Sequence, residues 1–232
     1  MTETYALDTK YGRFTFDEAN HIYRLDEKIL RNNTAVLENV GITNYKSIPE
    51  EYLEFARVRG SAAHSAIRHF ENGTLERYEW HPIILEYLEG YKKFKRETDY
   101  RAVLTEQAMF SYIWRYATTL DTAGYMRALS NKFALIEIKT GTGQVPSAKI
   151  QVAGQSMALI EFRAFIPGGV IPEMNIGDFE NYVLEIKPND YKLHECEDVM
   201  SNIQVFTSAL WLDWWKNENL KGENHASNFA AA

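Results

Sequence analysis

Residues 116–155 decide the fold, and they read YATTLDTAGYMRALSNKFALIEIKTGTGQVPSAKIQVAGQ. Two runs rich in β-forming residues flank a turn at residues 130–131, so this stretch predicts a β-hairpin. Asp121 ends the first run, and Glu137 and Lys139 lie two positions apart in the second, where they share one face of a strand. Pairing of the two strands would bring Asp121 near Glu137 although fifteen residues separate them.

The hairpin would gather two carboxylates and one ammonium at a single point. Such a cluster is costly to bury unless a cation compensates its negative charge. Hard oxygen ligands favour a divalent ion such as Mg²⁺ or Mn²⁺. The sequence therefore predicts a site for one or two of these ions.

The segment after the hairpin changes its period. Residues 140–143, TGTG, break the strand, and residues 147–162 follow with helical spacing. An apolar stripe is expected along this helix at Ile150, Ala153, Met157 and Ile160. Gln151 and Gln155 are four positions apart and share a different face.

These motifs resemble a known family. The pattern D-x15-E-I-K-T-G followed by Q-V-A-G-Q is similar to the PD-(D/E)XK nuclease superfamily, in particular its RecB-like and phage-type exonuclease branch. The motifs of that branch read G-T-x-D, (D/E)-x-K-T-G and Q-x-x-x-Y. Thr118 replaces the glycine of the first motif, and Gln155 stands in place of the tyrosine. Neither departure removes a metal ligand.

The resemblance implies a fold and a domain plan. The expected class is α/β (α+β), with a restriction-endonuclease-like core of a central mixed β-sheet flanked by helices and an N-terminal β-hairpin. One nuclease domain would span residues 1–220, divided into a hairpin extension over 1–47 and a core over 48–220. Residues 221–232 are expected to form a disordered tail.

The resemblance also implies roles at the hairpin. Asp121, Glu137 and the backbone carbonyl of Ile138 would hold the metal. Lys139 would position the attacking water and stabilise developing charge, as a protonated ammonium. Gln151 would orient Lys139 or the scissile phosphate.

Two further ligands are expected from earlier segments. An R-G-x-x-x-H arrangement ending at His64 resembles the histidine motif of RecB-like nucleases, in which the histidine binds metal. Imidazole suits Mn²⁺ better than Mg²⁺. Glu106 is a further candidate ligand, although an exposed glutamate without a role is almost as plausible. His21 is interpreted as a surface or turn histidine.

Contacts to DNA are expected from a set of cationic and polar side chains. The set consists of Arg57, Arg59, Arg68, Lys92, Lys93 and Gln155. For any single lysine near residues 92–96, a solvated helix end is the simpler interpretation.

A second E-x-K pattern occurs at residues 185–187, with Asp178 upstream. It lacks the long hairpin, the T-G break and the glutamine helix. We interpret it as alternating charge on the solvent face of an edge strand.

The remaining elements are expected from periodicity and turn signals. They are a hairpin over 11–30, a helix over 49–72 that Gly60 interrupts or uses for close contact, a helix over 82–96, a strand or short helix over 101–114, strands at 182–187 and 191–196, and a helix over 198–217. The last helix should bury Ile203, Phe206, Leu210 and Trp214 and leave Trp211 and Trp215 partly exposed.

Composition narrows the functional classes. The 232 residues have a net charge of −7, which argues against a protein that coats nucleic acid nonspecifically. No apolar stretch reaches the length of a membrane span, and a cytoplasmic location is expected. Cys196 is the only cysteine, so an intrachain disulfide and a cysteine-built zinc site are excluded. No phosphate-binding loop, dinucleotide fingerprint or serine elbow occurs.

The predicted function is a metal-dependent DNA exonuclease that serves phage or mobile-element DNA recombination or repair. The expected partner is linear DNA, with either further copies of the chain or a single-strand annealing protein as a second partner, and no membrane. The alternatives are a structure-specific endonuclease of the same fold and a catalytically inactive nucleic-acid-binding accessory protein. A structural protein with a coincidental E-x-K would require Asp121 and Glu137 to lie far apart.

Overall fold

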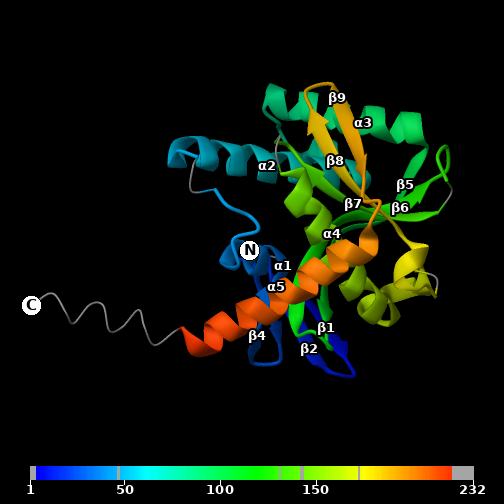
Figure 1. The fold of residues 1–232 in the computed structure, drawn as a ribbon. Coiled ribbons are helices and arrows are strands. Elements are labelled where there is room, and N and C mark those ends of the chain that lie inside the picture. The colour runs from blue at the N-terminus through cyan, green and yellow to red at the C-terminus, as the bar shows by residue number, and fades with distance from the viewer. Residues whose placement is uncertain (1–3, 46–47, 131, 142–143, 172, 221–232) are drawn as a thin grey trace, which may run out of the picture.

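The computed structural model describes residues 4–45, 48–130, 132–141, 144–171 and 173–220. Across these residues the chain builds one nine-stranded sheet in the order β1-β2-β3-β4-β6-β7-β8-β9, with β5 also paired to β6. The pairs β4–β6 and β7–β8 are parallel and the others are antiparallel. Helices lie against the sheet in Figure 1. The expected class, a mixed sheet flanked by helices with strands at the N-terminus, is confirmed.

The strands are β1 (Thr4–Thr9), β2 (Gly12–Asp17), β3 (Ile22–Leu25), β4 (Lys28–Asn32), β5 (Tyr100–Ser111), β6 (Tyr116–Met126), β7 (Phe133–Lys139), β8 (Glu180–Lys187) and β9 (Asp190–Glu195). The α-helices are α1 (Asn33–Asn39), α2 (Glu50–Glu71), α3 (Pro82–Thr98), α4 (Val145–Phe162) and α5 (Val199–Asn219). Short 3-10 helices are η1 (Leu75–Arg77), η2 (Arg163–Phe165), η3 (Pro167–Gly169) and η4 (Ile176–Asp178). None of the described helices has both the length and the apolarity that a bilayer crossing requires.

The N-terminal segment contributes more strands than expected. The predicted hairpin around residues 17–20 is present as β2 and β3, but β1 and β4 extend it on both sides. β4 then joins the main sheet beside β6, and Phe14 and Tyr23 are buried in the main core. The division at residue 48 stays a prediction, as does the tail over 221–232, which lies outside the described residues.

The edge of β6 that faces β4 and β7 is split. β5 pairs with β6 along almost its whole length on one edge. On the other edge, β4 pairs with Tyr116 and Ala117, and β7 pairs from Thr122 onward. In the described residues, positions 118–121 of β6 therefore lie between the ends of two strands and have no strand partner on that edge. We call this gap the β6 fork.

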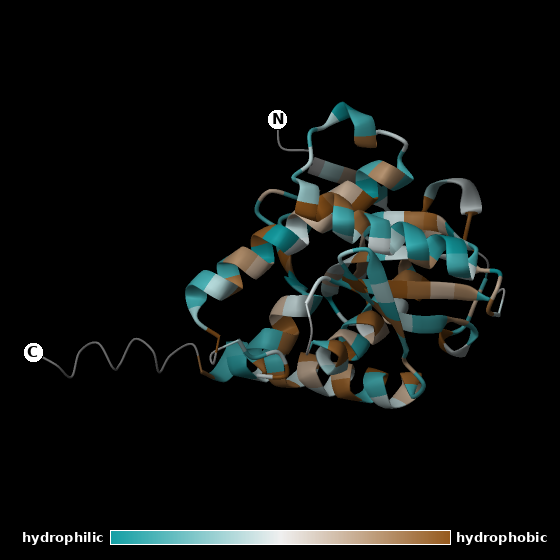
Figure 2. Ribbon diagram, turned by 90° about the horizontal axis from the view of Figure 1, so that it is seen from above, coloured by the Kyte–Doolittle hydropathy of each residue, from teal (hydrophilic) through white to brown (hydrophobic). Residues whose placement is uncertain are grey.

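Two apolar clusters fill the two faces of the sheet. α1, α4 and α5 pack on one face in the larger cluster, and α2 and α3 pack on the other. Figure 2 shows hydrophilic and hydrophobic segments alternating along the helices, as expected for elements that bury one side. Gly154 of α4 permits close contact with α5, because a Cβ there would lie 2.7 Å from the ring of Phe206.

The helices differ from expectation in three respects. α2 runs unbroken through Gly60, so the predicted interruption is wrong, while the alternative of a contact point agrees with a Cβ there lying 3.4 Å from Oγ1 of Thr140. α4 is buried on nearly all sides and has no single stripe, since Val152 and Leu159 are fully buried while Ile150 is half-buried. Trp214 is 56% exposed and was wrongly expected in the core, where Asp213 lies instead, whereas Trp211 is exposed as predicted.

Candidate active site

A cavity of about 770 Å³ lies between the N-terminal strands, α2 and strands β5 to β7. Its lining brings together residues from the N-terminal strands, α1, α2, β5, β6, β7 and α4. Among them are the predicted catalytic and ligand residues His64, Glu106, Asp121, Glu137, Lys139 and Gln151. The expectation that one hairpin gathers its charged side chains at a common point is met in this structure.

Three side chains in this cavity are close enough to share a cation. Single ligand atoms of His64, Glu106 and Asp121 all lie within 4.8 Å of one another. Nδ1 of His64 lies 3.3 Å from Oε1 of Glu106 and 3.7 Å from Oδ1 of Asp121. Its Nε2 lies 3.2 Å from the carbonyl oxygen of Ile138. The carbonyl predicted as a ligand is therefore adjacent to the same cluster.

Glu106 reaches the cluster from an irregular part of β5. The register of β5 against β6 shifts between Ala102 and Leu104. Glu106 itself has φ of 49°, a conformation that non-glycine residues rarely adopt and that costs on the order of 1–3 kcal/mol. Residues with a strained backbone of this kind occur most often at active sites and ligand-binding sites, where the surrounding structure holds them in place.

Asp121 lies in the β6 fork. Extending the pairing of Thr122 with Ile136 by one residue places Asp121 opposite Glu137. Because β7 ends its pairing there, the backbone amide of Ile138 donates instead to Oδ2 of Asp121 at 2.7 Å. This bond fixes one carboxylate oxygen and leaves the other beside His64.

Glu137, Lys139 and the two glutamines form a connected polar network. Nζ of Lys139 donates to Oε1 of Glu137 at 2.5 Å and to Oε1 of Gln151 at 3.1 Å. Nε2 of Gln155 donates to Oε2 of Glu137 at 2.6 Å and to the carbonyl of Thr119 at 3.2 Å. Gln155 thus supplies the donor that a partner strand would have given Thr119 in the fork.

The charges of this network shift one another's protonation. Burial raises the pKa of Asp121, and the charge of Glu137 adds to it, so that it reaches about 8. Burial lowers the pKa of His64, but Asp121 and Glu106 outweigh it and raise the pKa to about 9. Burial likewise lowers the pKa of Lys139, and Glu137 and Asp121 more than reverse it. Without a metal, protons neutralise part of the negative charge here.

The donor set fits a divalent cation. Carboxylate and carbonyl oxygens with one imidazole suit Mn²⁺ or Mg²⁺. Glu137 is 1% exposed, and its two carboxylate oxygens accept hydrogen bonds from Lys139 and Gln155. It is therefore not one of the three residues that are free to share the cation. Within the described part of the chain, Oε1 of Gln155 is buried without a hydrogen-bond partner. Each buried polar atom of this kind calls for a further partner such as water or a ligand.

The predicted DNA-contacting residues do not form one surface. Arg68 lines the large cavity, and Arg59 lines an adjacent cavity that also contains His64 and Lys139. Arg57 lines this second cavity as well and pairs with Glu50.

The other three lie elsewhere. Lys92 and Lys93 lie on α3, where they pair with Glu89 and Asp190. Gln155 is fully buried against Glu137 and is not available to DNA, so its assignment as a DNA contact is corrected.

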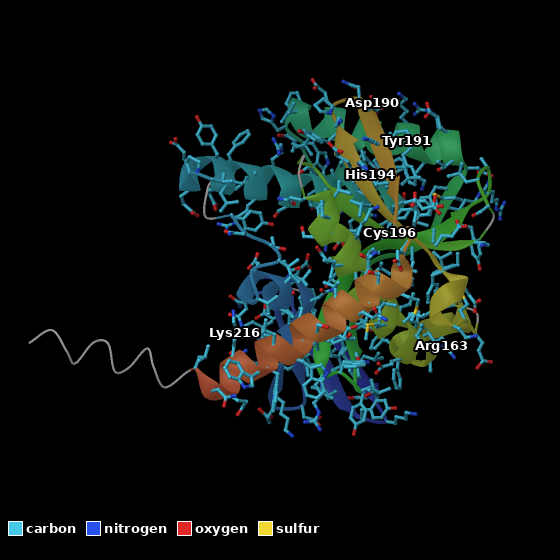
Figure 3. All side chains as sticks on the ribbon, viewed as in Figure 1. Arg163, Asp190, Tyr191, His194, Cys196 and Lys216 are labelled. Carbon is cyan, nitrogen blue, oxygen red and sulfur yellow. The ribbon has the colours of Figure 1, made fainter. Side chains whose placement is uncertain are left out.

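The glutamate of the second E-x-K is also buried, whereas the side chain of Lys187 is 45% exposed. Glu185 lies on β8, which β7 and β9 flank, so β8 is not an edge strand as predicted. Glu185 is 6% exposed, and its carboxylate accepts a hydrogen bond from Nε2 of His194 at 3.1 Å. Nζ of Lys187 forms an ion pair with the same carboxylate at 3.4 Å. Figure 3 shows His194 on the ribbon of β9. This cluster is separate from the His64 group.

The cavity wall includes His21, a residue for which no role in the site was predicted. It lies exposed in the turn before β3, as predicted, and it also lines the cavity, where its Nε2 lies 3.3 Å from the hydroxyl of Tyr23. That hydroxyl lies 2.8 Å from Oγ1 of Thr119 in the β6 fork. The residues His21-Ile22-Tyr23 stand out in the sequence, but nothing local shows that they face β6.

A solved structure resembles this chain in its fold, whereas the sequence comparisons find no match. No family model matches the sequence, and no curated protein matches it. Among solved structures, the crystal structure of LHK-Exo in complex with dAMP is 13% identical, with a TM-score of 0.34. The match covers 87% of this chain and 95% of the other. A likeness of this degree does not identify a function for the chain.

Proposed function

We propose that this protein is a divalent-metal-dependent nuclease that hydrolyses phosphodiester bonds in DNA, and that it acts as an exonuclease. The observation that supports the proposal best is the convergence of His64, Glu106 and Asp121 within 4.8 Å, beside the Lys139–Glu137 pair. Asp121 reaches this cavity from the β6 fork, His64 from α2 and Glu106 from β5. The alternative of a structural protein with a coincidental E-x-K required Asp121 and Glu137 to lie far apart. Asp121 instead accepts a hydrogen bond from the backbone amide of Ile138, the residue that follows Glu137.

The residues that would hold the cation are those nearest one another. His64, Glu106 and Asp121 would bind it, and the buried carboxylate of Glu137 would add negative charge nearby. The carbonyl of Ile138 lies against Nε2, the other ring nitrogen of His64, and its role as a ligand stays a prediction. When bound, a divalent ion supplies Lewis-acid stabilisation of charge on the phosphate and makes water more acidic.

Lys139 would act on the reacting phosphate and water. Its ammonium is held between Glu137 and Gln151, so its position is fixed before substrate arrives. A preorganised cation in a partly buried site stabilises growing negative charge at little reorganisation cost. Gln155 would keep the Glu137 carboxylate turned toward Lys139 by donating to its other oxygen.

The two E-x-K motifs offer a matched test. Lys139→Met and Lys187→Met each remove a lysine that follows a glutamate by two residues on neighbouring strands. On end-labelled linear DNA with Mg²⁺ or Mn²⁺, Lys139→Met and Asp121→Asn should lose at least about 100-fold in rate, and Lys187→Met should cut like the wild type. Equal rates for Lys139→Met and the wild type would overturn the assignment.

Two further assays separate the alternatives. An exonuclease degrades linear DNA and spares covalently closed DNA, whereas a structure-specific endonuclease cuts closed DNA that contains its target structure. A catalytically inactive binding protein would show no Mn²⁺ binding in calorimetric titration. The role in phage or mobile-element recombination, the cytoplasmic location, the oligomeric state and the annealing partner stay predictions.

A further inference from the structure

An ion pair spans the cavity between the N-terminal strands and α2. Nη1 of Arg68 on α2 donates to Oε1 of Glu18 at 2.5 Å, although fifty positions separate the two residues. Glu18 lies in the turn between β2 and β3, and both residues line the cavity that contains His64 and Asp121. The Arg68 side chain is 28% exposed and the Glu18 side chain is 44% exposed.

Both partners are held toward the cavity by local structure. Arg68 follows His64 by four positions on α2, so the two side chains share one face of that helix. The turn that carries Glu18 is fixed by Asp17, whose carboxylate accepts from the backbone and side-chain nitrogens of Asn20 at 3.2 and 2.7 Å. Arg68 is therefore directed into the cavity and occupied there by a carboxylate.

We infer that Glu18 lowers the affinity of the protein for DNA, because its carboxylate pairs with the Arg68 guanidinium at the place where a phosphate of the substrate would bind. This inference rests on the proposed function, and it adds the substrate class that Arg68 recognises, a backbone phosphate of DNA. Carboxylate and phosphate oxygens bind the guanidinium fork in the same way. DNA would have to displace Glu18, and the half-exposed carboxylate can turn into solvent when it leaves.

The competition has a specific signature. Exposed ion pairs are weak, so release of Arg68 by Glu18→Gln should tighten DNA binding by up to about fivefold. Arg68→Ala should weaken DNA binding. It should also reduce the magnitude of the slope of log affinity against log salt concentration by about 1, because about one fewer counterion is released when DNA binds. In the Arg68→Ala background, Glu18→Gln should have no effect, because there is no longer a guanidinium to release.

Binding of a fluorescein-labelled oligonucleotide, measured by anisotropy in Ca²⁺, tests this without relying on cleavage. Glu173→Gln is the matched control, because Glu173 pairs with Arg163 outside the cavity. Its affinity should equal that of the wild type. Thermal unfolding of each variant shows whether its fold is retained.

The outcomes distinguish the two proposals. An equal gain from Glu18→Gln with and without Arg68 would reveal general charge repulsion and overturn the competition. Unchanged binding in Glu18→Gln would overturn it as well, as would an absence of DNA binding by every variant. Tighter binding that depends on Arg68, in a protein that cleaves no DNA, would support the competition and reject the nuclease.

Discussion

The stability of the metal-free protein should fall as the pH rises, because of Asp121. Burial and then Glu137 raise the pKa of this carboxyl from 3.8 to about 8. A carboxyl group with a higher pKa in the folded chain stabilises the fold below its unfolded pKa. That stabilisation is lost as the pH rises toward the folded pKa. The affected window therefore runs from about pH 4 to about pH 8.

The size of the effect follows from linkage. One proton corresponds to about 1.4 kcal/mol for each pH unit in the window. A rise from about pH 6 to about pH 8 should remove about 2 kcal/mol through Asp121, which lowers Tm by about 4–8 °C in a chain of this size. His64 acts in the same direction. Its pKa is raised to about 9, so its stabilisation is present below 6.5 and lost as the pH rises through the folded value.

Thermal unfolding followed by circular dichroism in EDTA measures this dependence. Asp121→Asn, which cannot ionise, should lose about 4–8 °C less than the wild type over the same range and should be the more stable protein at pH 8. Glu197→Gln, a change at an exposed carboxylate, should behave like the wild type. Saturating Mn²⁺ should abolish most of the wild-type dependence, because a cation replaces the protons. Parallel pH curves for Asp121→Asn and the wild type would refute the reasoning.

Three further predictions concern other parts of the fold. Burial raises the pKa of Glu185, but hydrogen bonds from His194 and Lys187 together outweigh it and lower the pKa, so the stabilisation from this carboxylate is present above pH 4.5 and lost as the pH falls through the lower folded value. Glu185→Gln should thus cost about 1–3 kcal/mol near neutral pH in urea unfolding, with a smaller difference in acid. Burial raises the pKa of Cys196 to about 12, so iodoacetamide should modify the native protein at least about 100-fold more slowly than the urea-unfolded chain. Gly124→Ala should lower Tm, since a Cβ there would collide with the backbone of β5. Gly177→Ala should leave Tm unchanged, because a Cβ there has no atom within 4 Å.

The sequence predicted the local parts of the site well. The hairpin, the E-x-K face and the glutamine helix each follow from periodicity within a few residues, and the structure brings Asp121, Glu137, Lys139 and Gln151 into one cavity. His64 could be added only through a motif resemblance, because no local pattern shows which wall of the cavity a helix will supply.

The parts that were missed depend on long-range pairing. The short parallel pairing of β4 with the start of β6 joins residues about 85 positions apart, and no local pattern in the sequence predicts it. The burial of Glu185 follows from β9 pairing outside β8, which makes an apparent edge strand internal. The scattered positions of Lys92 and Arg68 could not be known before α2 and α3 were placed in space.

The end of β4 sets one side of the β6 fork, and the start of the pairing with β7 sets the other. β4 ends at Asn32, whose side chain caps α1 by accepting from the amide of Thr34 at 2.8 Å. A β4 longer by a few residues would run alongside residues 118–121, claim the carbonyl that Gln155 now contacts and close the space above Asp121. A helix cap outside the group of His64, Glu106 and Asp121 therefore helps to keep the cavity accessible, and the residue at which β4 ends matters to the candidate site as well as the charged side chains themselves.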